Sequence, residues 1–204
     1  MNQPVRIGVI GLGRAGWDLH VKPLAKHPGF SLVSVADPVA DRRSEAEAVF
    51  GVKTYTTREE MLAAGNLDAV VVASPTMFHF ADASDVLEHG LHCILEKPMT
   101  ATYSEALALA ALAKECQRCL LVHHIHVFRP LFHHLREILG GGKLGPLFEM
   151  QLFWGGYRRR MDWQALRKNG GGLLANYGSH LFSVFLPLLD GPVVRVSCEV
   201  RNIK

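Results

Sequence analysis

Six short apolar runs recur along the first 124 residues, separated by stretches with helical periodicity. The runs cover residues 5–10, 32–36, 52–55, 68–74, 91–95 and 119–124. Most are continuous runs of Val, Ile and Leu rather than strict alternations of apolar and polar residues. Such runs are typical of strands buried on both faces of a parallel sheet. The pattern therefore predicts six strands of one parallel sheet.

The stretches between these runs have the apolar spacing of amphipathic helices, and they cover residues 14–27, 40–50, 58–64, 79–89 and 103–116. Two of them begin with a capping box, in which Thr57 precedes Glu60 and Thr102 precedes Glu105 by three positions. Strand and helix in repeated alternation predict an α/β fold, a Rossmann-type doubly wound parallel sheet over residues 1–124.

The pattern changes over residues 125–204. It predicts a helix near 130–139, an alternating strand over 147–154, a helix over 173–189 and a second alternating strand over 193–203. Alternation of apolar and polar positions is typical of antiparallel strands with one face in water. We therefore expect residues 125–204 to form a partial α+β domain with an open, mostly antiparallel sheet that this chain does not complete.

Composition and charge narrow the classes of partner. The chain has 204 residues, 49% of them hydrophobic, and a formal net charge of +3. This charge is too small to predict a nucleic acid or an anionic membrane as partner. No stretch reaches the roughly 18 apolar residues of a membrane helix, and the first residues lack the layout of a signal peptide. The expectation is a cytoplasmic location.

A C-x-x-C pair, Cys116 and Cys119, precedes histidines at 123, 124 and 126, which raises the alternative of a zinc site. Structural zinc sites usually combine two such pairs in knuckles or loops. This pair instead lies between the end of a predicted helix and an apolar run. We therefore expect ordinary buried thiols and no metal site.

The segment between the first predicted strand and the first helix reads Gly11-x-Gly13-x-x-Gly16. In a dinucleotide-binding turn the first glycine allows a tight turn, the second lets a pyrophosphate approach the backbone, and the third lets helix and strand pack closely. Free N–H groups at the start of the helix then face the anionic diphosphate. The spacing and its context predict a dinucleotide site.

Asp37 ends the second predicted strand, 21 residues beyond Gly16. A carboxylate at this point accepts hydrogen bonds from the adenosine ribose diol and repels a 2′-phosphate, which favours NAD. Arg42 and Arg43 leave NADP open as the second choice. The alternative interpretation of Asp37 is a helix-terminal residue beside Pro38.

Three stretches resemble the Gfo/Idh/MocA oxidoreductase family, named after glucose–fructose oxidoreductase, inositol dehydrogenase and a rhizopine-catabolism protein. They are VRIGVIGLGRAGWDLH (5–20), ASPTMFHFADASDVLEHGLHCILEKPMT (73–100) and GGGLLANYGSHLFSVFLPLLDG (170–191). They span the chain in the family's order. The resemblance implies a longer second domain than this chain supplies, built on a broad antiparallel sheet that commonly forms a homo-oligomer contact. The resemblance also implies a set of cofactor-binding residues: Gly11, Leu12, Gly13, Arg14, Ala15, Gly16, Asp37, Ser74, Pro75, Thr76, His79, Glu96 and Lys97.

By the same resemblance Lys97 is the catalytic lysine, near both nicotinamide and substrate. An ammonium there stabilises the negative charge that develops on an alcohol oxygen as hydride leaves its carbon. The alternative is a surface lysine before a turn proline. His180 matches the family's proton-transferring histidine, and imidazole titrates near neutral pH. Asn176 lies one turn earlier as a substrate-binding residue, where many relatives have an aspartate, and an amide binds a hydroxyl but carries no proton.

The resemblance thus implies an NAD(P)-dependent oxidoreductase that transfers a hydride between a nicotinamide cofactor and a secondary alcohol of a sugar, inositol or related polyol. The alternative is a non-catalytic nucleotide-binding protein or an inactive, truncated relative. Lys97, Asn176 and His180 carry the first interpretation.

Overall fold

The computed structural model describes residues 3–156 and 161–201. Of these, 3–124 and 161–179 form one compact unit, and 125–156 and 180–201 form the other.

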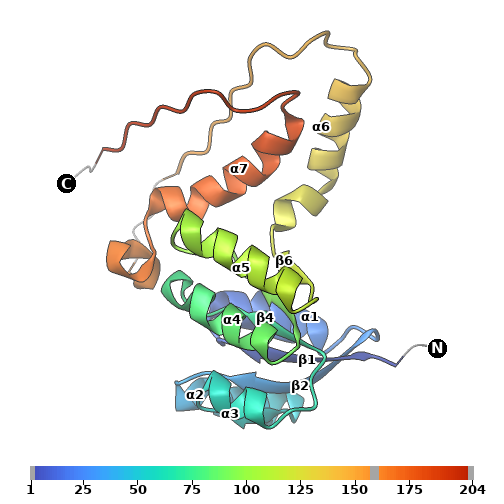
Figure 1. Cartoon of the computed structure of the whole chain (residues 1–204), viewed down its shortest axis with the longest axis vertical. Coiled ribbons are helices and arrows are strands. Elements are labelled where there is room, and N and C mark those ends of the chain that lie inside the picture. The colour runs from blue at the N-terminus through green and yellow to red at the C-terminus, as the bar shows by residue number, and fades with distance from the viewer. Residues whose placement is uncertain (1–2, 157–160, 202–204) are drawn as a thin grey trace. The chain divides into compact units, whose positions relative to one another are not determined.

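The first unit contains a six-stranded sheet in the order β3-β2-β1-β4-β5-β6. Figure 1 labels β1, β2, β4 and β6 of this sheet. Every neighbouring pair is parallel. This confirms the doubly wound parallel sheet expected from the apolar runs. The strands are β1 (Val5–Ile10), β2 (Phe30–Ala36), β3 (Lys53–Tyr55), β4 (Ala69–Val72), β5 (His92–Leu95) and β6 (Leu120–Val122).

Both faces of the central strands are buried, which explains their continuous apolar sequence. On β4, Val70 and Val72 belong to one buried cluster, and Ala69 and Val71 belong to another. Successive side chains of a strand point to opposite faces, so each face needs its own apolar residues. The order reverses at β1, which lies between β2 and β4. In open α/β sheets ligands bind outside the carboxyl ends of the strands at such a switch point.

Helices connect these strands as the periodicity predicted. Both predicted capping boxes form, at Thr57 and at Thr102. The helices between the strands are η1 (Gly16–Val21), α1 (Lys22–Leu24), α2 (Ala40–Phe50), α3 (Arg58–Ala63), η2 (Thr76–Phe78), α4 (His79–Glu88) and α5 (Tyr103–Glu115). The later segment of the same unit contains η4 (Trp163–Ala165), η5 (Arg167–Asn169) and η6 (Leu174–Gly178).

The second unit contains η3 (Ile125–Phe128), α6 (Pro130–Gly140) and η7 (Leu186–Leu188), and α7 (Ser179–Phe185) begins one residue before it. These helices agree with the expected ones near 130–139 and 173–189. The open antiparallel sheet is not confirmed, because residues 147–154 and the described part of 193–203, up to 201, form no strand. A strand needs a hydrogen-bonded neighbour, and Phe148 and Phe153 are 95% and 94% exposed.

The thiol expectation is wrong for Cys119. Cys119 is exposed and Cys116 is half-buried. The physical reason is topological, because β6 is an edge strand and the residue just before it has no neighbouring strand on its outer side. Across the described residues, no helix is long and apolar enough to cross a membrane.

Candidate cofactor and catalytic site

The glycine turn after β1 is shaped by contacts that exclude side chains at two of its three glycines. Gly11 has φ +89°, and a Cβ there would lie 2.8 Å from backbone atoms of Ala73 and Ser74. A Cβ on Gly16 would collide with the carbonyl oxygen of Gly11. A Cβ on Gly13, in contrast, would meet nothing within 4 Å. The turn therefore packs against the end of β4, and its middle glycine faces open space.

The helix after this turn starts at Arg14 and Ala15 and continues as the π-helix η1. The backbone N–H of Trp17 donates to the carbonyl of Gly13 at 2.8 Å. A π-turn accommodates more residues per turn than an α-helix. Within this turn His20 is buried in the first unit.

Asp37 follows β2 directly, and its carboxylate is bound on both oxygens. One oxygen accepts the backbone N–H of Leu12 at 2.7 Å and the other that of Val39 at 2.9 Å. The guanidinium of Arg42 lies 3.3 Å from the first. The carboxylate thus links the end of β2 to the glycine turn, in the place expected of a ribose-binding acid.

The loop after β4 is linked to the Glu-Lys-Pro segment by His79. The buried imidazole lies 2.8 Å from the carbonyl of Pro98 through Nδ1 and 2.9 Å from the carbonyl of Ser74 through Nε2. Burial lowers the pKa of His79 and outweighs these two contacts, which would raise it. A neutral imidazole donates through one nitrogen only. The imidazole of His79 therefore donates to one of these carbonyls and lies against the other, so it contacts both loops of the site.

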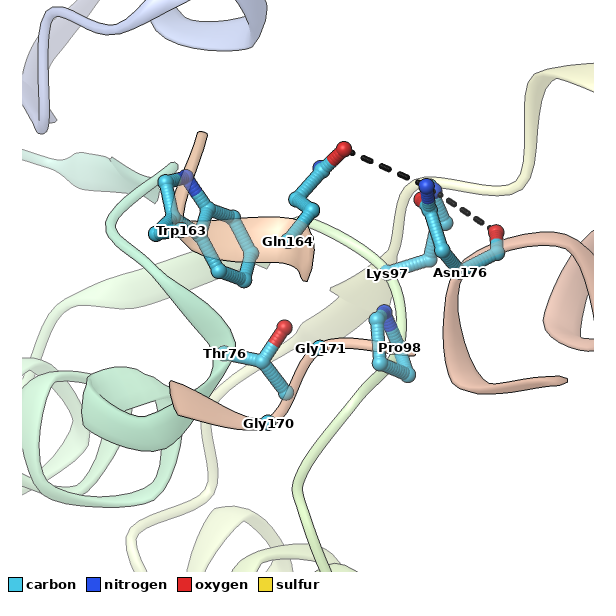
Figure 2. A pocket seen from close by; sticks show the side chains of 8 residues that line it. All are labelled: Thr76, Lys97, Pro98, Trp163, Gln164, Gly170, Gly171 and Asn176. Carbon is cyan, nitrogen blue, oxygen red and sulfur yellow. Dashed lines mark hydrogen bonds between the residues drawn. The ribbon is translucent and has the colours of Figure 1, made fainter. Parts of the chain in front are cut away.

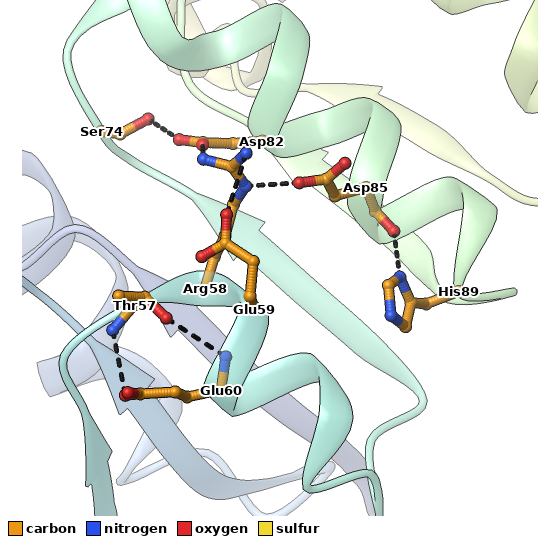
Figure 3. Close-up of polar contacts among 8 residues, drawn as sticks. All are labelled: Thr57, Arg58, Glu59, Glu60, Ser74, Asp82, Asp85 and His89. Atoms are coloured by element: carbon orange, nitrogen blue, oxygen red, sulfur yellow. Dashed lines mark hydrogen bonds and ion pairs between the residues drawn. The ribbon is translucent and has the colours of Figure 1, made fainter.

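Ser74 is held by a charged network between α3 and α4 (Figure 3). Its hydroxyl donates to Asp82, whose other oxygen accepts from Arg58 at 2.9 Å. Arg58 also pairs with Asp85. Burial raises the pKa of Asp82, although the Ser74 hydroxyl and the charge of Arg58 act in the opposite direction. Figure 3 shows the Arg58 side chain reaching from α3 to both carboxylates on α4.

Glu96, at the carboxyl end of β5, is buried, and its carboxylate is held by two histidines. Oε1 lies 2.8 Å from Nε2 of His20 and 2.7 Å from Nδ1 of His123. Oε2 accepts the backbone N–H of Lys97 at 3.2 Å. Burial acts to raise the pKa of Glu96, but the hydrogen bonds of His123 and His20 outweigh it and hold that pKa well below its usual range. The carboxylate is therefore kept charged and oriented inside the unit.

Lys97 contacts Asn176 directly (Figure 2). Its Nζ donates to Oδ1 of Asn176 at 3.0 Å and to the backbone carbonyl of Asn176 at 3.1 Å. The amide nitrogen of Asn176 donates to Oε1 of Gln164 at 3.2 Å, which fixes the amide so that its oxygen faces the lysine. Thr76 and Gly170 line the same small pocket. The structure thus brings Lys97 and Asn176 together from distant segments.

His180 belongs to the second unit, where its ring lies among aromatic neighbours. The ring of His126 lies 4.6 Å from it, edge-on, and the ring of Trp154 lies stacked at 6.3 Å. The hydroxyl of Ser183 donates to the carbonyl of His180 at 2.8 Å. The pairing of His180 with Lys97 stays a prediction.

The first unit fits a dinucleotide in two respects. The turn is open above Gly13, where a pyrophosphate needs to approach the backbone. The hydroxyl of Thr76 is buried with no hydrogen-bond partner in the described part of the chain. A buried hydroxyl without a partner is costly, so a polar ligand group at this point would be stabilising.

Sequence reasoning missed Arg58, Gln164 and His20, and it considered His123 only as a zinc ligand beside the C-x-x-C pair, not as a partner of Glu96. The partners of each contact are far apart in the sequence, and only folding reveals them. A weak signal was present for Glu96 and His123, because each directly follows an apolar strand and β5 and β6 are neighbours. His20 carried no such signal, since a histidine within a helical stretch is ordinary.

Two family models match consecutive parts of this chain. Residues 5–124 match the oxidoreductase family with an NAD-binding Rossmann fold, and residues 132–204 match the GFO/IDH/MocA C-terminal domain. The chain belongs to the Gfo/Idh/MocA family. Its Rossmann domain is accordingly an NAD-binding domain, as the glycine turn predicted.

Named relatives agree with this family. The chain is 32% identical to the rhizopine catabolism protein MocA of Rhizobium meliloti, over 87% of this chain and 55% of that protein. It is 27% identical to scyllo-inositol 2-dehydrogenase (NAD(+)) of Bacillus subtilis, over 98% of this chain and 58% of that protein. A solved NAD-binding protein from Listeria innocua is 29% identical with a TM-score of 0.78, over 93% of this chain and 56% of that one. The chain thus spans about half the length of these relatives.

Proposed function

We propose that this Gfo/Idh/MocA protein is an NAD(P)-dependent oxidoreductase that transfers a hydride between a nicotinamide cofactor and a secondary alcohol of a sugar, inositol or related polyol. The observation that carries the proposal is the ammonium of Lys97 held against Asn176 just beyond the carboxyl end of β5. This edge of the sheet also carries the glycine turn and Asp37. The similarity to an NAD-dependent inositol dehydrogenase supports the substrate class.

Each residue has a chemical task in this proposal. The nicotinamide ring supplies the hydride acceptor for the alcohol carbon. Lys97 stabilises the negative charge that develops on the alcohol oxygen, and such preorganised electrostatic stabilisation is typically a large term in catalysis. Asn176 offers its amide to a substrate hydroxyl, and its contact with Gln164 keeps the amide in one orientation. His180 receives or returns the proton, a task suited to imidazole.

The cofactor-binding residues divide into contacts and supports. Gly13 and Arg14 offer the backbone of the turn to the pyrophosphate, and Asp37 offers its carboxylate to the ribose, which favours NAD over NADP. Leu12 supports Asp37, because its backbone N–H donates to that carboxylate. Gly11 and Gly16 instead allow the close packing that shapes the turn. Ser74, Pro75 and Thr76 line the edge after β4. His79 and Glu96 act by positioning, because their side chains are occupied by Ser74, Pro98, His20 and His123.

The proposal also includes the organisation of the protein. Residues 1–124 form the dinucleotide-binding domain, and residues 125–204 form part of a substrate and oligomerisation domain. The segment that carries Asn176 belongs to the first compact unit, where Asn176 contacts Lys97. We propose a small-molecule polyol or sugar as the substrate and a homo-oligomer as the assembly once the second sheet is complete.

The test combines binding with turnover. NADH binding by the purified chain is followed by nicotinamide fluorescence, and cofactor reduction is followed by absorbance with a panel of inositols, sugars and nucleotide sugars. We expect NADH to bind and at least one polyol to reduce NAD slowly, with Lys97→Ala as the matched control that binds NADH but does not turn over. NADH binding with no turnover across the panel would favour the non-catalytic nucleotide-binding protein.

A further inference from the structure

Three side chains from distant segments converge inside the first unit, and the proposed reaction uses none of them to contact substrate. They are His20 on η1, Glu96 at the end of β5 and His123 just after β6. Each offers one ligand atom, and these three atoms lie within 4.8 Å of one another. The two imidazole rings lie 4.6 Å apart with an interplanar angle of 58°. Across the described residues, this is the group whose histidine, cysteine and carboxylate atoms meet the geometry of a metal site, and the C-x-x-C pair is not part of it.

A bound cation suits the charge of the cluster. The side chains of Glu96 and His20 are 8% and 6% exposed, so the carboxylate is almost fully removed from water. A buried carboxylate is strongly unfavourable unless a cation or several donors compensate it. Its side-chain partners here are two imidazoles, which carry no permanent charge. A proton on one imidazole balances the negative charge of the Glu96 carboxylate. A bound divalent ion also balances this charge, and both imidazoles then serve as neutral ligands.

The donor set selects the kind of ion. Two histidine nitrogens and one glutamate oxygen form the three-ligand set that zinc accepts in sites whose fourth position is open. Zinc–ligand bonds of about 2.0–2.1 Å in a tetrahedron separate the ligand atoms by roughly 3.3 Å. Oε1 lies 2.8 Å from His20 Nε2 and 2.7 Å from His123 Nδ1. Widening each contact by about 0.5 Å, through small side-chain rotations, makes room for the ion.

Access and orientation also suit a metal. The side chain of His123 is 23% exposed, which gives an ion and a fourth ligand such as water a way in. The second oxygen of Glu96 accepts the backbone N–H of Lys97 and so fixes the carboxylate from behind. Outer contacts of this kind orient ligands in metal sites.

We propose that His20, Glu96 and His123 form a binding site for a divalent transition-metal ion, with Zn²⁺ as the best-matched ion. The site joins η1, β5 and β6 around a single point, and Glu96 directly precedes Lys97 in the chain. Its role is structural, because the ion stabilises the backbone from which Lys97 projects. The site does not depend on the proposed dehydrogenase activity, so either proposal can fail without the other.

The experiment is a metal titration of the chain after chelator treatment and removal of the chelator. Co²⁺ is the probe, because a four-coordinate cobalt ion absorbs strongly in the visible range, and Zn²⁺ is then added in competition. We expect one equivalent of Co²⁺ to produce this absorption without a thiolate charge-transfer band, and Zn²⁺ to displace it. Zn²⁺ should also raise the melting temperature, since a ligand bound only by the folded state stabilises it. Absence of the visible band together with no zinc-induced melting shift overturns the proposal.

Variants assign the site to its residues. Glu96→Gln keeps the shape of the side chain but removes its charge, and His123→Ala removes one ligand. We expect each variant to weaken Co²⁺ binding by at least about a hundredfold, because mutation of residues that only orient metal ligands already lowers metal affinity by about 10–100-fold. The matched control is His133→Ala with His134→Ala, an exposed pair on α6, which should bind normally. Circular dichroism confirms that each variant is folded. Unchanged binding in folded Glu96→Gln and His123→Ala, or loss of binding in the control, overturns the assignment.

Discussion

Lys97 donates hydrogen bonds from one ammonium group to both oxygens of Asn176, the side-chain Oδ1 at 3.0 Å and the backbone carbonyl at 3.1 Å. The two residues lie 79 positions apart in the sequence. Two acceptors on one residue fix the direction of the flexible lysine side chain. The contact therefore defines where a substrate hydroxyl meets a positive charge in the proposed reaction.

Replacement of Lys97 by alanine tests its catalytic task. We expect turnover of a reactive polyol to fall by about a hundredfold or more, because preorganised electrostatic stabilisation is lost. NADH affinity should change by less than about twofold, since the ammonium contacts Asn176 rather than the glycine turn. Steady-state kinetics and NADH fluorescence measure the two effects, with Lys114→Ala on α5 as an exposed control. A loss of NADH affinity large enough to account for the whole loss of turnover would assign Lys97 to cofactor binding.

Alanine at two glycines of the same turn should affect different properties, NADH binding at Gly13 and folding stability at Gly16. At Gly13 the added Cβ meets nothing within 4 Å, so Gly13→Ala should keep the melting temperature but weaken NADH binding by obstructing the pyrophosphate. At Gly16 the Cβ collides with the carbonyl of Gly11, so Gly16→Ala should lower the free energy of unfolding by about 3 kcal/mol. Chemical denaturation and NADH titration measure both. If Gly13→Ala binds NADH normally, the dinucleotide does not lie over this turn.

Asp37 should set the preference between NADH and NADPH. We expect the unmodified chain to bind NADH more tightly, and Asp37→Ala to narrow that gap by about 1–3 kcal/mol, through a lost charge-assisted hydrogen bond and relieved repulsion of the 2′-phosphate. Because Asp37 also accepts the N–H of Leu12, Asp37→Asn serves as the companion variant that keeps an acceptor. Isothermal titration with both cofactors measures the gap, and equal affinities in the unmodified chain would refute the preference.

Arg58 should stabilise the loop after β4 through Asp82. The Asp82 side chain is 4% exposed, and Arg58→Ala leaves it without its cation, so we expect a loss of about 3 kcal/mol in the free energy of unfolding at neutral pH. Burial already raises the pKa of Asp82. Without Arg58 the pKa of Asp82 in the folded state should rise further, so the folded variant takes up a proton on Asp82 more readily than the unfolded chain. The loss in the free energy of unfolding should therefore become smaller as pH falls.

The double variant Arg58→Ala with Asp82→Asn is the control for this prediction. It removes the buried charge along with its partner and should recover part of the lost stability. Urea denaturation at several pH values measures all three chains. An equal loss in the single and the double variant would show that packing of the arginine side chain, and not charge, is responsible.

Asp68 should make the chain less stable in acid. The Arg6 side chain and backbone both donate to its carboxylate and lower its pKa from 3.8 to about 2. A carboxyl whose pKa is lowered by folding contributes stability above its unfolded pKa, and this contribution disappears as pH falls toward the folded value. Stability due to this pair should therefore decline between about pH 4 and pH 2. Asp68→Asn should be less stable at pH 7 and should change less over this interval, while Glu115→Gln, an exposed carboxyl on α5, should behave like the unmodified chain.

The sequence alone predicted the first sheet because its information is local. Most of the strands lie in short apolar runs, and the runs at the centre of the sheet need both faces buried, which a parallel sheet covered by helices provides. The capping boxes at Thr57 and Thr102 are likewise local, since each involves residues three positions apart. The antiparallel strands expected over 147–154 and 193–203 depend on partners elsewhere in a sheet, and alternation alone does not supply a partner.

What the sequence determined by itself is therefore the succession of strands and helices, the glycine turn with Asp37, and membership of the family through motifs that lie within single segments. Only the tertiary structure decided which side chains meet. The contacts of Lys97 with Asn176, of Arg58 with Asp82, and of Glu96 with His20 and His123 each join residues that are tens of positions apart. The physical reason is that hydrophobic periodicity fixes which face of an element is buried, whereas polar contacts form between faces that folding brings together.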